Sequence, residues 1–203
     1  MKKVIFTSGL LFLNLFVNVT QSMETLHTVP AEPLFVAISK GDIGTVTQLL
    51  KVDANPAIVD SNGLTPLHYV VQYGHVAIAK FLIDHGANIN ANYNRFGFTP
   101  LHMAAHYGQT HIAQILINAA ACLRAQDALG RTPLHEAAMN GHISTVELLI
   151  KFGPELTREG DVHNLLPRDL AGQNGYGDII RILDAAEFPT FKLIEGYDDF
   201  GDD

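Results

Sequence analysis

A period of 33 or 34 residues runs through most of this 203-residue chain and limits the folds that it can adopt. Three similar segments, LTPLHYVVQYGH, FTPLHMAAHYGQ and RTPLHEAAMNGH, begin at Leu64, Phe98 and Arg131. Weaker copies, EPLFVAISKGD and LPRDLAGQNGY, precede and follow them. The aligned prolines are Pro33, Pro66, Pro100, Pro133 and Pro167, and a glycine follows each of them by eight residues. Such self-similarity is typical of a solenoid, in which repeated units stack and share one continuous core.

The residue types within each copy predict a short helix, a tight turn and a longer helix. Thr65 and its equivalents are favourable N-cap residues, and each following proline takes the first helical position, where its missing N–H costs nothing. Gly74 and its equivalents suit the left-handed conformation that ends a helix. Residues 76–83 and 143–150 each place apolar side chains on one face, so the second helix of each unit is predicted to be amphipathic.

The pattern G-x-TPLH-x-A-A-x-x-G-H resembles the ankyrin-repeat family, over about residues 31–187. The resemblance implies an all-α solenoid of stacked helix-turn-helix units that carry β-hairpin-like fingers. We expect a short lead at 23–30, units at about 31–59, 60–93, 94–126, 127–160 and 161–187, and an acidic tail at 188–203. The first and last of these five units are degenerate, as end caps are expected to be. The tail is interpreted as solvated, or alternatively as a motif that docks on a partner or folds over the stack.

Residues 1–22 have the composition of a secretory signal. Lys2 and Lys3 precede an apolar run from residue 4 to residue 19, and the small residues Thr20 and Ser22 fit a cleavage after residue 22. We therefore expect a mature chain that begins at Met23, has no membrane span and is secreted or periplasmic. Two alternatives remain, an uncleaved membrane anchor and a translation start at Met23 that would leave the protein in the cytosol.

Composition argues against several classes of ligand. The formal net charge of −8 opposes binding to the phosphates of nucleic acid. The single cysteine, Cys122, cannot form an internal disulfide, and no Cys/His cluster has the spacing of a structural zinc site. Neither a glycine-rich phosphate loop nor a nucleophile motif is found. No cofactor or metal is therefore expected.

The histidines of FTPLHMAAHYGQTH raise a separate question, because His102 and His106 have the four-residue spacing of a zinc hydrolase. The glutamate that serves as general base in HExxH is missing between them. His102 also recurs as His68 and His135 in the other TPLH segments, and the resemblance implies that these histidines hydrogen-bond the turn to the helix. We therefore predict that the protein has no catalytic residues and is not an enzyme.

The resemblance places binding residues on a concave face, at the finger tips and at the ends of the first helices. Seven residues there have side chains typical of the centre of an interface. They are Tyr73, Phe96, Phe98, His106, Tyr107, Arg131 and Met139. We expect them to face solvent, unless a phenylalanine folds back onto the neighbouring finger. The predicted function is that of an exported, monomeric protein that binds another protein through this face. The alternative is a regulatory, inhibitory or protective subunit of an envelope or secreted enzyme.

Overall fold

The computed structural model describes residues 33–52, 54–93 and 96–187, and within these ranges the regular secondary structure is helical. Ten α-helices follow one another in pairs, and a short 3-10 helix, η2, lies between the last two pairs. The bounds are α2 Pro33–Ser39, α3 Ile43–Lys51, α4 Pro66–Tyr73, α5 Val76–Asp84, α6 Pro100–His106, α7 Thr110–Asn118, α8 Pro133–Met139, α9 Ile143–Phe152, η2 Pro154–Arg158, α10 Pro167–Gln173 and α11 Gly177–Glu187. The predicted all-α solenoid is confirmed, whereas the predicted signal, lead and tail lie outside the described residues.

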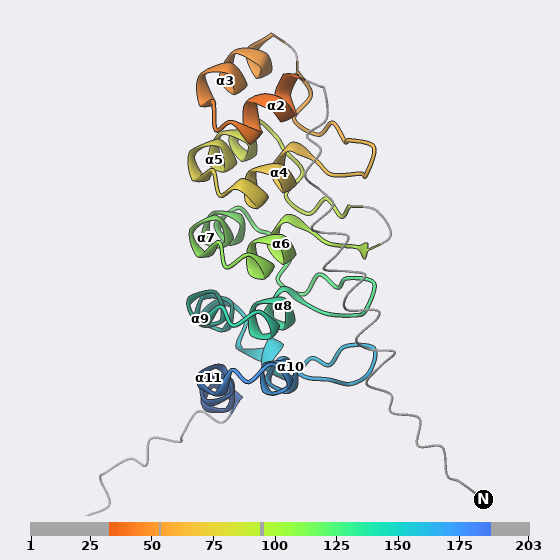
Figure 1. The fold of residues 1–203 in the computed structure, drawn as a ribbon, viewed down its shortest axis with the longest axis vertical. Helices are drawn as coiled ribbons and strands as arrows, with labels where there is room; N and C mark the ends of the chain where they lie inside the picture. The colour runs from red at the N-terminus through yellow and green to blue at the C-terminus, as the bar shows by residue number, and fades with distance from the viewer. Residues whose placement is uncertain (1–32, 53, 94–95, 188–203) are drawn as a thin grey trace, which may run out of the picture.

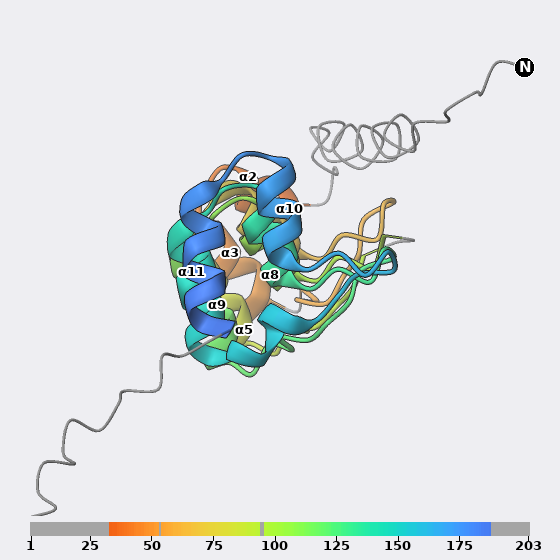
Figure 2. The same cartoon turned by 90° about the horizontal axis from the view of Figure 1, so that it is seen from below.

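The helix pairs are stacked along the long axis of the molecule (Figure 1). The first helices of the pairs form one column and the second helices form another, and each helix packs on its counterparts in the adjoining pairs. The loops between pairs project as fingers on the side of the first helices (Figure 2). Within the described residues, the only isolated β-bridge of these fingers joins Tyr93 and Phe98. We call the surface formed by the finger tips and the C-terminal ends of the first helices the inner face.

The core between the two columns comes from the amphipathic pattern of the second helices. Leu82, Leu116 and Leu149 occupy equivalent positions in α5, α7 and α9, and all three are fully buried. Ala104 and Ala105 of α6 are also fully buried, and such small side chains let neighbouring helices approach closely. No helix in the described ranges has the length and apolar character needed to cross a membrane.

The TPLH histidines connect the second, third and fourth helix pairs each to the pair that follows. In the second pair, Nδ1 of His68 accepts hydrogen bonds from the backbone N–H and the hydroxyl of Thr65, at 3.2 and 2.8 Å. The proton of the neutral ring therefore lies on Nε2, which donates to the carbonyl oxygen of Phe98 in the following finger at 3.2 Å. His102 and His135 repeat this arrangement with the carbonyls of Arg131 and Leu165. The structural role that the resemblance implies for these histidines is thus confirmed.

The last pair lacks the histidine, and the residue in its place makes only one of the two contacts that the histidines make. Asp169 stands at the equivalent position of α10, and its Oδ2 accepts a hydrogen bond from the backbone N–H of Leu166 at 2.9 Å. A carboxylate can accept but not donate, so Asp169 stabilises the start of its own helix and makes no bond to a further finger. In PRDLA, the aspartate that replaces the histidine of PLHEA therefore keeps the bond within the unit and lacks the donor for a bond between units.

Candidate protein-binding face

The seven residues predicted to contact a partner divide into two groups by burial. Tyr73, Phe96, His106 and Tyr107 are half-buried, whereas Phe98, Arg131 and Met139 are buried. All of them lie in the finger tips or near the ends of α4, α6 and α8. The expectation that all seven face solvent is wrong.

Phe98 is only 1% exposed and belongs to the scaffold. Its backbone pairs with that of Tyr93 in the finger, and its ring lies 6.3 Å from the ring of Tyr93 and 5.5 Å from that of His102. The equivalent residue of the preceding unit, Leu64, is also fully buried. In the three TPLH units the side chain two residues before the motif proline therefore points into the core, and the apolar Leu64 was the signal for this in the sequence.

Arg131 occupies that same inward position and is only 3% exposed. Its Nε and one terminal nitrogen donate to Oδ2 of Asp127 at 2.9 and 2.8 Å, and the second terminal nitrogen lies 3.5 Å from the sulfur of Met139. Met139 is itself 5% exposed. Arg131 turns inward because a buried carboxylate on its own finger compensates its charge.

A second carboxylate, Glu136 of α8, extends this pair into a network that reaches the inner face. Its Oε1 lies 3.1 Å from Arg131 but receives no hydrogen bond from it, so this contact is an ion pair only. Its Oε2 accepts a hydrogen bond of 2.9 Å from Nδ1 of His106 on α6. Glu136 is fully buried, whereas the His106 side chain is 13% exposed. His106 is therefore the member of the network through which the buried charges meet solvent.

The charges in this network stabilise one another. Burial by itself would raise the pKa of Glu136, but the Arg131 charge and the His106 hydrogen bond outweigh burial, so the pKa lies below its usual value. Burial would likewise lower the pKa of Arg131, and the charges of Glu136 and Asp127 raise it instead. Both side chains are therefore ionised throughout the neutral range.

Glu136 and Asp127 were not among the predicted site residues, although the sequence carries a signal for Glu136. At the positions of Arg131 and Glu136 the other TPLH units and the last unit have apolar or aromatic residues. These are Leu64 with Tyr69, Phe98 with Met103, and Leu165 with Leu170. One unit has thus exchanged two such residues for an arginine and a glutamate together, and such a paired departure indicates a contact between the two side chains.

Half-buried aromatic rings share the inner face with His106, and one of them contacts it. The Tyr107 ring meets the His106 ring edge to face at a centroid distance of 5.1 Å, and Phe96 lies 6.4 Å from the buried ring of Tyr93. Tyr73, one helix pair away, stacks on His75. Burial raises the pKa of Tyr107, so its hydroxyl stays protonated and available as a hydrogen-bond donor. These rings pack against the core on one side and leave the other side accessible.

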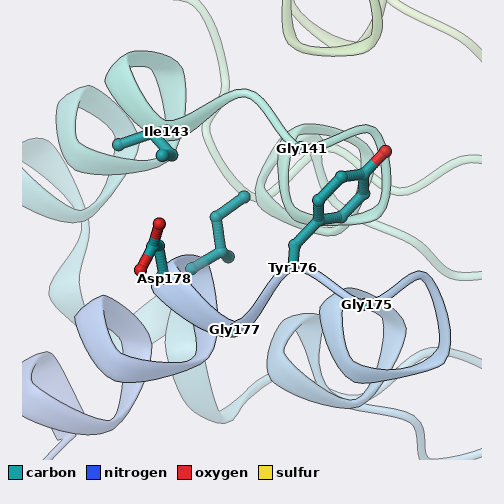
Figure 3. Close-up of a pocket in the computed structure, with 7 residues that line it drawn as sticks. Gly141, Ile143, Gly175, Tyr176, Gly177 and Asp178 are labelled. Carbon is teal, nitrogen blue, oxygen red and sulfur yellow. The ribbon is translucent and has the colours of Figure 1, made fainter.

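A small hollow near the other end of the stack is a weaker candidate site (Figure 3). It has a volume of about 150 Å³ and lies between the turn after α8 and the turn before α11. Tyr176 packs over Gly141 beside it, while Ile143 and Asp178 border it. The Asp178 carboxylate is paired with Arg181. The hollow therefore offers no cluster of reactive or unpaired polar groups.

The described ranges contain no group of three His, Cys, Asp or Glu side chains arranged to hold a metal ion. His102 and His106 do not converge on one point, because Nε2 of His102 bonds to the Arg131 carbonyl while Nδ1 of His106 bonds to Glu136. Their four-residue spacing thus serves two separate structural contacts.

Comparison with known proteins relates the chain to one family. Four overlapping segments, residues 12–93, 34–127, 90–160 and 119–188, match the profile described as Ankyrin repeats (3 copies). The human ankyrin repeat domain-containing protein 39 is 36% identical over 69 residues, which are 34% of this chain and 38% of that protein. A palmitoyltransferase of Schizosaccharomyces pombe is 41% identical over 61 residues, which are 29% of this chain and 9% of that protein. The 2-5A-dependent ribonuclease of Mus musculus is 49% identical over 57 residues, which are 27% of this chain and 8% of that protein. The chain thus spans well under half the length of these relatives.

Proposed function

Because this chain belongs to the ankyrin-repeat family, we propose that it is an exported, non-enzymatic, monomeric protein that binds another protein through its inner face. Ankyrin repeats are general protein-interaction modules. The observation that carries the proposal is the group of half-buried side chains on the inner face, Tyr73, Phe96, His106 and Tyr107. Aromatic side chains that are supported by a core and accessible on one side supply much of the binding energy in protein interfaces.

The enzymes among the relatives do not argue for catalysis by this chain. The segments matched in the palmitoyltransferase and in the ribonuclease are less than a tenth of each enzyme. Both enzymes carry other domains besides their repeats. Since function depends on the site rather than on the shared fold, the similarity supports a common scaffold and not a common activity.

Tyr107→Ala tests the binding face. We expect it to weaken partner binding by about 2 kcal/mol, roughly thirtyfold, because it removes a central aromatic contact. It should also lower the free energy of unfolding by about 1 kcal/mol, since the ring is half-buried. The partner is first captured from source cells with the mature chain and identified by mass spectrometry, and the dissociation constants are then measured by calorimetry.

Phe152→Ala is the matched control for this experiment. Phe152 is an exposed aromatic residue at the end of α9, in the column of second helices and away from the inner face. Its truncation should leave the dissociation constant unchanged. Equal binding by wild type and Tyr107→Ala would show that the partner uses another surface, and the inner face would then be abandoned as the binding site.

Export is supported by the sequence of residues 1–22, with its two lysines, its apolar run and its small residues before the cleavage point. We expect the mature protein to begin at Met23 when the full gene is expressed in its native cells. N-terminal sequencing of the protein recovered outside the cytoplasm tests this. A sequence that begins at Met1, or protein found only in the cytosol, would contradict the proposed export.

A further inference from the structure

We propose that the inner face at α6 and α8 binds a basic segment of the partner protein, and that an arginine of this segment stacks on Tyr107 and hydrogen-bonds to His106. This inference rests on the proposed function and specifies the chemistry of the partner. Four observations carry it: the sign of the buried charge, the proton on His106, the Tyr107 ring beside it, and the exchange of two core residues for an ion pair in one unit.

The charge behind the inner face is negative. Four buried carboxylates lie there, and among the described residues of the finger tips and of the C-terminal ends of the first helices from α4 to α10 the only Lys or Arg is the buried Arg131. Arg95, in a finger tip, lies outside the described residues. The carboxylates are Asp60, Asp127, Glu136 and Asp161. Buried charges are screened less by salt than exposed ones, so their field extends to the surface and favours a cationic partner.

His106 offers a hydrogen-bond acceptor at this surface. Its Nδ1–H donates to the carboxylate of Glu136, so in the neutral ring Nε2 carries no proton. The Asn140 amide, 3.2 Å from the same Nδ1, already donates to the backbone carbonyl of Glu136 at 2.8 Å. No described residue is hydrogen-bonded to Nε2 of His106, so this nitrogen can accept a hydrogen bond from a bound partner in place of water.

The ring of Tyr107 beside His106 makes a guanidinium the donor that fits best. Arginine is planar, carries five N–H groups and stacks on aromatic faces, so it can contact Tyr107 and donate to His106 at once. The attraction of cations by the face of an aromatic ring adds to that of the buried carboxylates.

The ion pair of Arg131 and Glu136 gives little net stability compared with the apolar side chains found at these positions elsewhere in the stack. What it adds is specific to the inner face: it places a negative charge beneath His106 and fixes the proton on Nδ1 of that ring. A role in recognition explains why one unit carries this pair, and stability alone does not.

The test titrates the mature chain with three capped pentapeptides, Gly-Arg-Gly-Arg-Gly, its citrulline counterpart and its glutamate counterpart, and follows the ring signals of His106 and Tyr107 by NMR at pH 7.5. Citrulline has the shape of arginine without its charge. We expect the arginine peptide to shift both signals, to bind at least about tenfold more tightly than the citrulline peptide, and to weaken as salt increases. The glutamate peptide should cause no shift.

Two variants complete the test. Glu136→Gln keeps the size of the side chain and an acceptor for His106 but removes the charge, and Tyr107→Ala removes the ring. Each should weaken the arginine peptide about fivefold or more, whereas Phe152→Ala should not change it. Equal shifts with the three peptides, no dependence on salt, or unchanged binding by Tyr107→Ala would overturn the inference. If Glu136→Gln does not fold, the citrulline comparison and the salt dependence still show whether the charge of the arginine contributes to binding.

These outcomes are separate from those that test the proposed function. A natural partner that is lost in Tyr107→Ala but contacts the inner face through a segment without arginine would overturn only the inference. A natural partner that still binds Tyr107→Ala with wild-type affinity would overturn the proposed function itself. Crosslinking at residue 107, followed by sequencing of the crosslinked partner peptide, distinguishes the two results.

Discussion

Replacing Arg131 with leucine is expected to lower the free energy of unfolding by about 3–5 kcal/mol, the usual cost of removing one partner of a buried ion pair. Arg131 is buried between Asp127 and Glu136, and its loss leaves two buried carboxylates without a counter-charge. The cost arises from this uncompensated charge, since leucine itself suits the position, which holds Leu64 and Leu165 in other units. Urea denaturation of the mature chain gives the measurement.

The double variant Arg131→Leu, Glu136→Leu separates charge from packing. It recreates the pair Leu165 and Leu170 of the last unit, and exchanging a buried ion pair for apolar side chains is often neutral or stabilising. We therefore expect the second substitution to restore most of the stability that the first removes. Leu116→Ala is the contrasting control, because it creates a cavity that costs about 2–5 kcal/mol and is not restored by Glu136→Leu. A double variant as unstable as Arg131→Leu would show that the charges are not the cause.

Acidification from pH 7 to pH 4 is expected to destabilise the fold by about 3 kcal/mol through His68 alone. Burial lowers the pKa of His68 to about 4, from the ordinary histidine value of 6.5. Below pH 6.5 His68 becomes protonated in the unfolded chain, whereas in the folded chain it stays neutral until about pH 4. The contribution of His68 to the free energy of unfolding is therefore fully present above this window and is lost as the pH falls through it. Burial also lowers the pKa of His102 and His135, and they add to the loss in the same direction.

His68→Gln isolates the contribution of one histidine. Glutamine at this third helical position can accept a hydrogen bond from the backbone N–H of Thr65 but does not titrate. The plot of unfolding free energy against pH should therefore be less steep between pH 6.5 and pH 4, by up to about 1.4 kcal/mol per pH unit. His111→Gln, at an exposed position of α7, should leave the slope unchanged. Equal slopes for His68→Gln and wild type would mean that His68 is not buried in its neutral form.

The fold was predictable because the residues that determine it are local and repeated. Threonine, proline and histidine at the start of each first helix, and glycine at its end, specify the same turns in each TPLH unit without reference to distant contacts. The amphipathic second helices then have one way to bury their apolar faces, which is to stack. Family resemblance and elementary helix chemistry agree at these positions.

The site was predictable only in part, because exposure depends on the direction of a side chain as well as on its position along the chain. Phe98 and Arg131 lie in the finger tips, as predicted, but the backbone there turns both side chains into the stack. The hydrogen bond from His106 to Glu136 joins residues 30 positions apart, on helices that become neighbours only when the stack forms. Chain position indicates which residues lie near the inner face, and packing decides which of them a partner can touch.

The histidine bonds between helix pairs also give the stack a direction. Each runs from one pair to the finger carbonyl of the next, so a duplicated TPLH unit inserted into the interior would find a donor before it and a carbonyl after it. After α11 a duplicated unit would not meet such a donor, because the carboxylate of Asp169 can only accept hydrogen bonds. Insertion within the stack therefore preserves a histidine bond on each side of the new unit. A unit placed after α11 would join the stack without one, as the second pair joins the first, where Phe35 stands at the histidine position.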